Sequence, residues 1–133
     1  DVDRGYIVQH KSNRVRGGVS FTSAANGYFQ GLASDGAKLA LCRVAHEQWC
    51  EPDSALYGSR TILFAHDEII MEAPLAKVND AAMRLKFVME ESMREYVPDV
   101  AIEAEPAAML RWSKKAQPLF DEKGELIPWT PQC

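Results

Sequence analysis

Hydrophobic residues recur at steps of three and four along two stretches of the chain, which predicts two helical regions. The first covers residues 21–50, and Asn26-Gly27 is expected to separate a short helix from a longer one near 30–50. The second covers 75–96 and opens after Pro74, a residue that suits the first turn of a helix. Ser20, Thr22 or Ser23 could cap the first helix.

Each helical stretch has an expected buried face. In the first stretch the expected apolar contacts are Phe21, Ala25, Tyr28, Phe29, Leu32, Leu39, Cys42 and Trp49. In the second stretch they are Val78, Ala82, Leu85, Met89, Met93 and Tyr96. The pairs Asp80–Arg84 and Glu90–Arg94 are spaced to interact on the outer face of the second helix.

Short apolar runs predict strands near 60–65 and 68–73, and an alternating run predicts a third strand near 99–105. Residues 1–20 are expected to be loop and extended segments, and 118–133 a tail with a turn near 121–124. The order of elements predicts an α+β fold, in which helices pack on one face of a small antiparallel sheet.

Three glycines, Gly27, Gly31 and Gly36, lie within the first helical stretch. A glycine lets another backbone or a ligand approach a helix closely. The sequence leaves tight packing and ligand approach equally open.

Composition narrows the class of protein. Apolar residues make up 47% of the 133 residues, which excludes a disordered tail. The net charge of −4 argues against a free-standing nucleic-acid binder, although it allows one segment of a larger one. Basic residues outnumber acidic ones only near the start of the chain. There the acidic residues are Asp1 and Asp3, His10 lies nearby, and the basic residues are Arg4, Lys11, Arg14 and Arg16.

The three cysteines, Cys42, Cys50 and Cys133, have no CxxC spacing, so neither a disulfide framework nor a zinc site is expected. No stretch has the length and apolarity of a membrane span or a signal peptide, and a reducing cytoplasm is the expected location. The first residue is Asp1 rather than methionine, which suggests a cleaved, split or truncated product.

The turn between the first two predicted strands carries three titratable residues, His66, Asp67 and Glu68. Tight hairpins usually place Asn-Gly or Asp-Gly at such a turn. Departures from local rules often mark functional sites, but a solvated structural turn explains the same residues.

Two motifs in order resemble the C-terminal palm segment of family A, polymerase I-like DNA polymerases. Gln30-Gly31-Leu32-Ala33-Ser34-Asp35 resembles the family's QGTAAD segment, and Ala65-His66-Asp67-Glu68-Ile69 resembles its VHDEL hairpin. Trp112 with Ala116 resembles the family's Gly-x-x-Trp-x-x-Ala ending, although three residues rather than two separate them. The resemblance covers about residues 5–117 and implies that 1–133 is a fragment of a larger polymerase fold, of a divergent phage type.

The resemblance implies roles for individual residues. Asp67 matches a Mg²⁺-binding aspartate, Glu68 its supporting carboxylate in the metal site, and His66 a histidine near the primer 3′ end. Asn26 and Gln30 match residues that touch the minor groove of the primer-template. The implied cofactor is Mg²⁺ in a two-metal site completed by a residue outside this chain, and the implied partners are primer-template DNA, a dNTP and the remainder of the polymerase.

The chain departs from the family at several positions. Thr22 stands where many relatives have an arginine on the DNA-contacting face, Ala65 replaces a valine, and Glu105-Pro106-Ala107 replaces a glycine context. Residues 118–133 extend beyond the usual end. The family's upstream DYSxxELR motif and its fingers helix do not occur in the sequence, so the chain is expected to be inactive without an upstream partner, in a bacterial or phage-infected cell.

Three other interpretations compete. The first is a non-catalytic binding or interaction module in which His66-Asp67-Glu68 is only a turn. The second is a hydrolase using His66 and Asp67 with Ser34 or Ser54, although no GxSxG context is present. The third is an inactive relic of a polymerase, which the intact His-Asp-Glu triplet disfavours.

Overall fold

The computed structural model describes residues 5–131, so Asp1, Asp3, Arg4 and Cys133 lie outside the described residues. The described part has an α+β fold with two separate two-stranded antiparallel sheets, as the predicted fold class requires. The elements in chain order are β1 (Tyr6–Val8), β2 (Val15–Gly17), α1 (Phe21–Cys50), β3 (Arg60–Ala65), β4 (Glu68–Glu72), the 3-10 turn η1 (Leu75–Lys77) and α2 (Val78–Tyr96).

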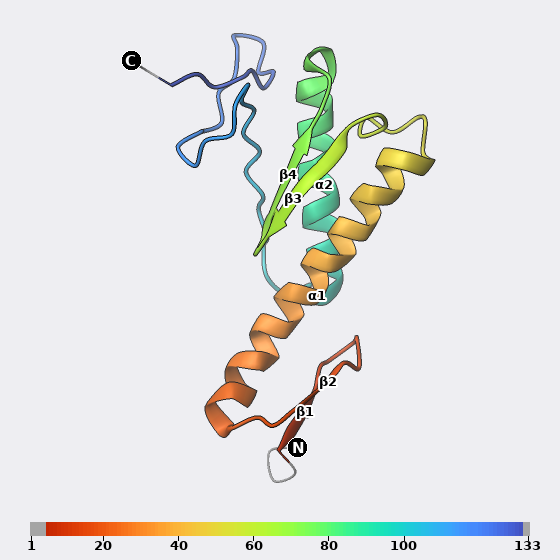
Figure 1. Cartoon of the computed structure of the whole chain (residues 1–133), viewed down its shortest axis with the longest axis vertical. Helices are drawn as coiled ribbons and strands as arrows, with labels where there is room; N and C mark the ends of the chain where they lie inside the picture. The colour runs from red at the N-terminus through yellow and green to blue at the C-terminus, as the bar shows by residue number, and fades with distance from the viewer. Residues whose placement is uncertain (1–4, 132–133) are drawn as a thin grey trace.

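Helix α1 is the axis of the molecule (Figure 1). Its 30 residues span about 45 Å at 1.5 Å per residue. Ser20 caps it, because its Oγ accepts a hydrogen bond from the Ser23 amide at 3.3 Å. The predicted break at Asn26-Gly27 is wrong. Packing around the buried Gly27 outweighs the weak helix propensity of a single glycine.

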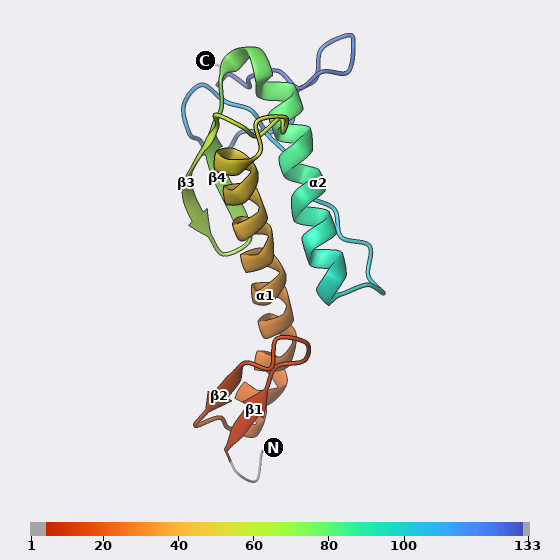
Figure 2. The ribbon, with the colours of Figure 1, turned by 90° about the vertical axis from the view of Figure 1, so that its right-hand side faces the viewer.

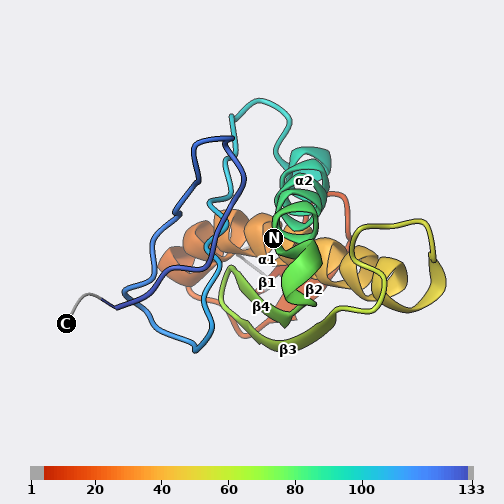
Figure 3. The same cartoon turned by 90° about the horizontal axis from the view of Figure 1, so that it is seen from above.

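The hydrophobic core lies between the C-terminal part of α1, helix α2 and the hairpin of β3 and β4 (Figures 1 and 2). Its fully buried members are Val44, Leu56, Ala81 and Val88. The partly buried residues packed against them are Ile69, Met71, Ala73 and Leu85. The two helices therefore cover one face of the β3–β4 hairpin, as predicted for the first two strands, and Figure 3 shows the hairpin on one side of the helix pair.

The buried face of α2 is displaced by one residue from the predicted stripe. Ala81, Val88 and Ser92 are the buried residues of this helix, whereas Ala82, Met89 and their predicted companions are only half-buried. The predicted outer-face pairs are also wrong. Packing of the helices lets Arg84 reach across to Glu47 of α1, while Glu90 and Arg94 pair with other residues one turn away on α2 itself, Lys86 and Glu91.

The predicted third strand near 99–105 does not form. Side chains of α2 take the backbone groups that a strand ladder would use: Lys86 Nζ donates to the Ala104 carbonyl at 2.7 Å, and the Ala104 amide donates to Glu90 Oε1 at 2.9 Å. Two long charged side chains thus hold this segment along the helix in an extended, unpaired form.

The predicted contacts of the first helical stretch are also wrong in part. The predicted contacts that are in fact exposed are Phe21, Ala25, Tyr28, Phe29, Cys42 and Trp49, and Phe21 and Phe29 are 75% and 72% accessible. The N-terminal half of α1 extends beyond α2, and the β1–β2 hairpin packs beside it there (Figures 1 and 2). One small hairpin leaves most of that half of the helix uncovered.

The segment after Pro106 is irregular and returns to the start of α2. Leu126 is buried, and its amide donates to Asn79 Oδ1 at 2.8 Å. The predicted turn at 121–124 is present, because Asp121 Oδ1 accepts the amides of Lys123 and Glu125. No helix among residues 5–131 has the length and apolarity needed to cross a membrane.

Candidate functional site

The turn that joins β3 to β4 carries the predicted catalytic residues. Ala65 pairs with Glu68 across the hairpin, so His66 and Asp67 form a two-residue loop. His66 has a φ of 57°, in the left-handed region that residues with a side chain seldom adopt. The strands therefore hold a non-glycine backbone in an unfavourable conformation, a feature that clusters at functional sites.

The hairpin that presents this turn is anchored on both the core and the end of α1. Ile69 and Met71 pack on the core cluster. The buried Gln48 of α1 accepts hydrogen bonds from the amide and the hydroxyl of Thr61 at 3.3 and 3.1 Å, and it donates to Ser59 Oγ at 3.2 Å. The turn therefore stands at the end of a fixed hairpin.

The side chains of His66, Asp67 and Glu68 are exposed. They form no hydrogen bond or ion pair with residues 5–131. Two adjacent carboxylates offer hard oxygen donors of the kind that Mg²⁺ prefers. No group of three or more His, Cys, Asp or Glu residues that could hold a metal ion is present in the described part of the chain.

The predicted DNA-contacting residues lie on α1, away from the core. Asn26 and Gln30 are both exposed and stand one helical turn apart on the continuous helix, so they share a face. Thr22 is exposed one turn earlier. The three residues form a stripe, here called the amide stripe, along the uncovered half of α1.

A groove separates the β1–β2 hairpin from α1, and Gln30 is part of its wall. The other lining residues come from both hairpin strands and from the same helix: Ile7, Gln9, Arg14, Val15, Arg16, Gly27, Gly31 and Ser34. The groove and the amide stripe are therefore continuous at Gln30.

The three helix glycines are packing positions. A Cβ at Gly27 would stand 3.1 Å from Ile7 Cδ1, and one at Gly31 would stand 1.9 Å from Gln9 Oε1. Gln9 is buried there, and its Nε2 donates to the Tyr28 carbonyl at 2.8 Å.

The third glycine, Gly36, lies where α1 meets α2, and a Cβ built there would stand 2.7 Å from the Sδ of Met93. Side chains of this chain therefore occupy the space beside all three glycines. The glycines allow tight packing rather than the close approach of a ligand.

The predicted hydrolase set that uses Ser54 is not brought together, and the other candidate, Ser34, lines the groove beside α1. Ser54 precedes β3 and His66 follows it, so the strand of six residues, about 20 Å long, lies between them. Ser54 Oγ is also engaged, since it donates to Glu47 at 2.6 Å and accepts the Leu56 amide at 3.1 Å.

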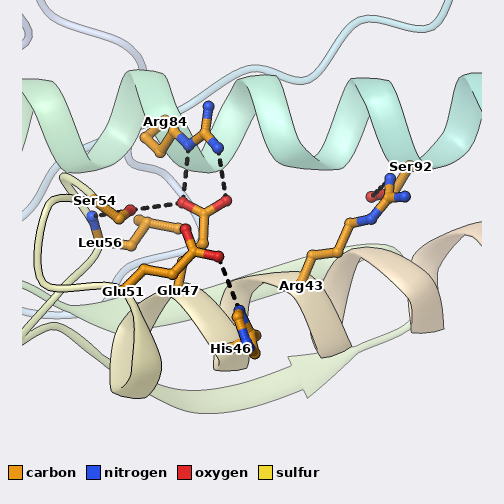
Figure 4. A network of polar contacts seen from close by, with 8 residues as sticks. All are labelled: Arg43, His46, Glu47, Glu51, Ser54, Leu56, Arg84 and Ser92. Atoms are coloured by element: carbon orange, nitrogen blue, oxygen red, sulfur yellow. Dashed lines mark hydrogen bonds and ion pairs between the residues drawn. The ribbon is translucent and has the colours of Figure 1, made fainter.

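A polar network near the C-terminal end of α1, shown in Figure 4, joins that end to α2 and to the loop before β3. Glu47 of α1 is buried and accepts Arg84 Nε and Nη2 at 2.8 and 2.7 Å. These hydrogen bonds from Arg84, opposed by burial and aided by Ser54, hold the pKa of Glu47 below its usual value. The two residues are 37 positions apart, so no local pattern indicates this pair.

Several bacterial proteins named DNA polymerase I are similar to this chain. The protein of Deinococcus radiodurans is 36% identical over 86 residues, which cover 65% of this chain. The protein of Streptococcus pneumoniae is 29% identical over 121 residues, covering 79%. The protein of Borreliella burgdorferi is 30% identical over 96 residues, covering 71%.

These alignments span 8%, 13% and 10% of the lengths of those three relatives. No protein-family model matches the chain. No solved structure matches it either.

Proposed function

We propose that this chain is the C-terminal part of the palm of a family A DNA polymerase, of a phage type. Its similarity to several bacterial DNA polymerase I proteins supports a family A DNA polymerase. In this proposal the complete enzyme adds nucleotides to a primer by template-directed nucleotidyl transfer, and residues 1–133 supply one part of its active site.

One observation carries the proposal. A fixed β-hairpin presents His66 and Asp67 at an exposed two-residue turn, with Glu68 at the start of the next strand, in a chain with sequence similarity to DNA polymerase I. A two-residue hairpin loop requires a positive φ at its first position, so the conformation of His66 follows from the turn itself, whereas the turn does not require two adjacent carboxylates. A cation that meets this turn explains why two exposed carboxylates stand side by side there.

The donor set at the turn fits Mg²⁺ in part. Asp67 would be a direct ligand through its carboxylate, and Glu68 would add negative charge beside it. Mg²⁺ bound in a two-metal site stabilises the attacking and leaving oxygens of a phosphoryl transfer. The remaining protein ligands would come from the upstream palm, outside this chain.

The other residues of the proposal have positioning roles. His66 would lie near the primer 3′ end, where its ring can hydrogen-bond. Asn26 and Gln30 would donate to purine N3 and pyrimidine O2 acceptors in the minor groove. Every base pair presents such acceptors, so these contacts hold the duplex without reading its sequence.

The interaction-module alternative makes a different prediction about the same turn. The exposure of large side chains such as Phe21, Phe29 and Trp49 is compatible with either interpretation, because both expect a partner surface. Only the polymerase proposal requires the negative charge of Asp67.

The decisive test is single-nucleotide incorporation by the complete polymerase at saturating Mg²⁺. Asp67→Asn keeps the shape of the side chain but removes its charge, and a neutral amide is a poor ligand for a hard dication. We expect the rate of nucleotide addition to fall roughly a thousandfold or more. Glu68→Gln should reduce the rate less, because its role is supporting.

The matched control is Asp99→Asn, which removes an exposed carboxylate elsewhere in the chain. It should leave the rate within about twofold, a change near the small effect expected of surface substitutions. Near-normal activity of a folded Asp67→Asn enzyme would refute the proposal. Primer extension by highly purified 1–133 alone would refute its claim that the active site is incomplete.

A further inference from the structure

Arg16 of β2 lies across the groove onto α1. Its Nη1 would stand 3.3 Å from a Cβ built at Gly27, so the guanidinium rests where the helix has no side chain. Arg16 is exposed and forms no ion pair with the part of the chain that the structure describes. Its charge is therefore available to a ligand at the mouth of the groove.

The neighbouring Arg14 has a different role. Its Nη2 pairs with Asp35 Oδ1 at 2.8 Å, and Asp35 is buried and also accepts Ser12 Oγ at 2.6 Å. Arg14 is thus neutralised and ties the hairpin to α1. Of the two arginines of this hairpin, only Arg16 presents an uncompensated charge.

The surroundings of Arg16 are cationic although the whole chain is acidic. Residues 5–36 contain three cationic side chains, Lys11, Arg14 and Arg16, and one carboxylate, Asp35, whereas the chain carries a net charge of −4. Positive charge is therefore concentrated at the end of the molecule that holds the amide stripe.

The position of Arg16 connects it to that stripe. Gln30 and Arg16 line the same groove, and Gly27, on which the guanidinium rests, follows Asn26 directly. Thr22, at the start of the stripe, has no charge to offer. The amide stripe of α1 carries no cation, and Arg16 of the adjacent strand β2 supplies one.

We propose that Arg16 is a positioning residue that binds a backbone phosphate of the primer-template duplex beside the minor groove contacted by Asn26 and Gln30. This inference rests on the proposed polymerase function. If the side-chain amides of Asn26 and Gln30 contact the minor groove, the backbone phosphates that flank the groove lie within reach of a cation beside these residues. A guanidinium suits this role, because its planar donors match two phosphate oxygens at once.

The experiment measures equilibrium binding of fluorescent primer-template to the complete polymerase over a series of salt concentrations. Loss of one phosphate contact should reduce the slope of log K against log salt by about one. Arg16→Ala should show this change and weaken binding by about tenfold at moderate salt, equally for all template sequences. The rate of nucleotide addition at saturating DNA should stay within about twofold.

Arg111→Ala is the matched control, because Arg111 is also exposed and has no ion pair with residues 5–131. Its salt slope should equal that of the parent. Arg16→Lys should restore the slope, since it keeps the charge, but only part of the affinity. Adding Thr22→Arg to Arg16→Ala should restore the slope as well, because it returns a cation to the same surface.

Two outcomes would overturn this role of Arg16, and a third would refute the function on which it rests. An unchanged salt slope in folded Arg16→Ala, with a parent that binds normally, would overturn it. A raised KM for the nucleotide with an unchanged slope would assign Arg16 to the nucleotide phosphates and also overturn it. A parent that does not bind primer-template at all would instead refute the polymerase function on which the inference rests.

Discussion

Two hairpins pack against the same helix, and they are attached by different chemistry. The β3–β4 hairpin lies on the C-terminal part of α1 mainly through apolar contacts of Ile69 and Met71 with the core, with added hydrogen bonds to the end of that helix. The β1–β2 hairpin lies on the N-terminal part mainly through polar contacts of Gln9, Ser12 and Arg14. Apolar burial fixes the first hairpin within the main core, whereas the second depends on a few specific pairs.

The difference agrees with what each hairpin is proposed to do. A carboxylate that binds a metal must be held within a fraction of an ångström, and a turn on a core-packed hairpin provides this. A cation that meets a DNA phosphate tolerates adjustment, because the attraction is long-ranged and weakly directional. The comparison predicts that the two hairpins respond differently to mutation.

The largest effect is expected from the apolar attachment. Leu56 is fully buried in the core cluster just before β3. Leu56→Ala should lower the free energy of unfolding of the chain by about 3 kcal/mol, measured by urea denaturation, because it leaves a cavity. Leu75→Ala is the control, since Leu75 is 63% exposed, and should change it by less than about 0.5 kcal/mol. Equal effects of the two substitutions would contradict the assignment of the core.

A smaller, pH-dependent effect is expected at the same end of α1. The pKa of Glu47 lies below its unfolded value of 4.5, so its ionic contribution is present above that pH and is lost as pH falls through the lowered pKa. Glu47→Gln should reduce the free energy of unfolding at neutral pH by roughly 1–2 kcal/mol, a value discounted because the Arg84 side chain is 40% exposed.

The difference between Glu47→Gln and the parent should shrink as the pH falls below about 4.5. Urea denaturation at several pH values measures it. Glu103→Gln is the control, because Glu103 is exposed and has no polar partner in residues 5–131. A difference that stays constant from neutral to acidic pH would show that the ion pair is not its source.

The smallest global effect is expected at the polar attachment. A methyl group at Gly31 must displace the Gln9 amide and its hydrogen bond to the Tyr28 carbonyl. The gain in helix propensity, about 1 kcal/mol, offsets the loss of that bond. Gly31→Ala should therefore change global stability by less than about 1 kcal/mol, but hydrogen exchange in β1 and β2 should be about tenfold faster.

Gly17→Ala is the matched control for Gly31→Ala. A Cβ at Gly17 would meet no atom within 4 Å, so exchange in β1 and β2 should be unchanged. If Gly31→Ala destabilised the whole chain as strongly as Leu56→Ala, the two hairpins would be attached equivalently and the contrast between them would fail.

The position of the candidate site could be predicted from the sequence more fully than the packing around it. Periodicity predicted the order of two helical regions and of strands near 60–65 and 68–73, and the gap between two apolar runs predicted the turn at His66-Asp67-Glu68. The β1–β2 hairpin, with two non-glycine residues, Lys11 and Asn13, at positive φ in its loop, carried no turn signal and was expected only as loop and extended chain.

The sequence by itself determined which elements form and which residues stand at the β3–β4 turn, because these depend on local periodicity and on chain order. Tertiary structure alone decided which helix face is buried, that α1 continues through Gly27, and that the segment near 99–105 lies unpaired along α2. It also decided that Arg14 is neutralised by Asp35 while Arg16 is not. These outcomes depend on contacts between residues far apart in the chain, and their energies exceed the local preferences that a sequence pattern reports.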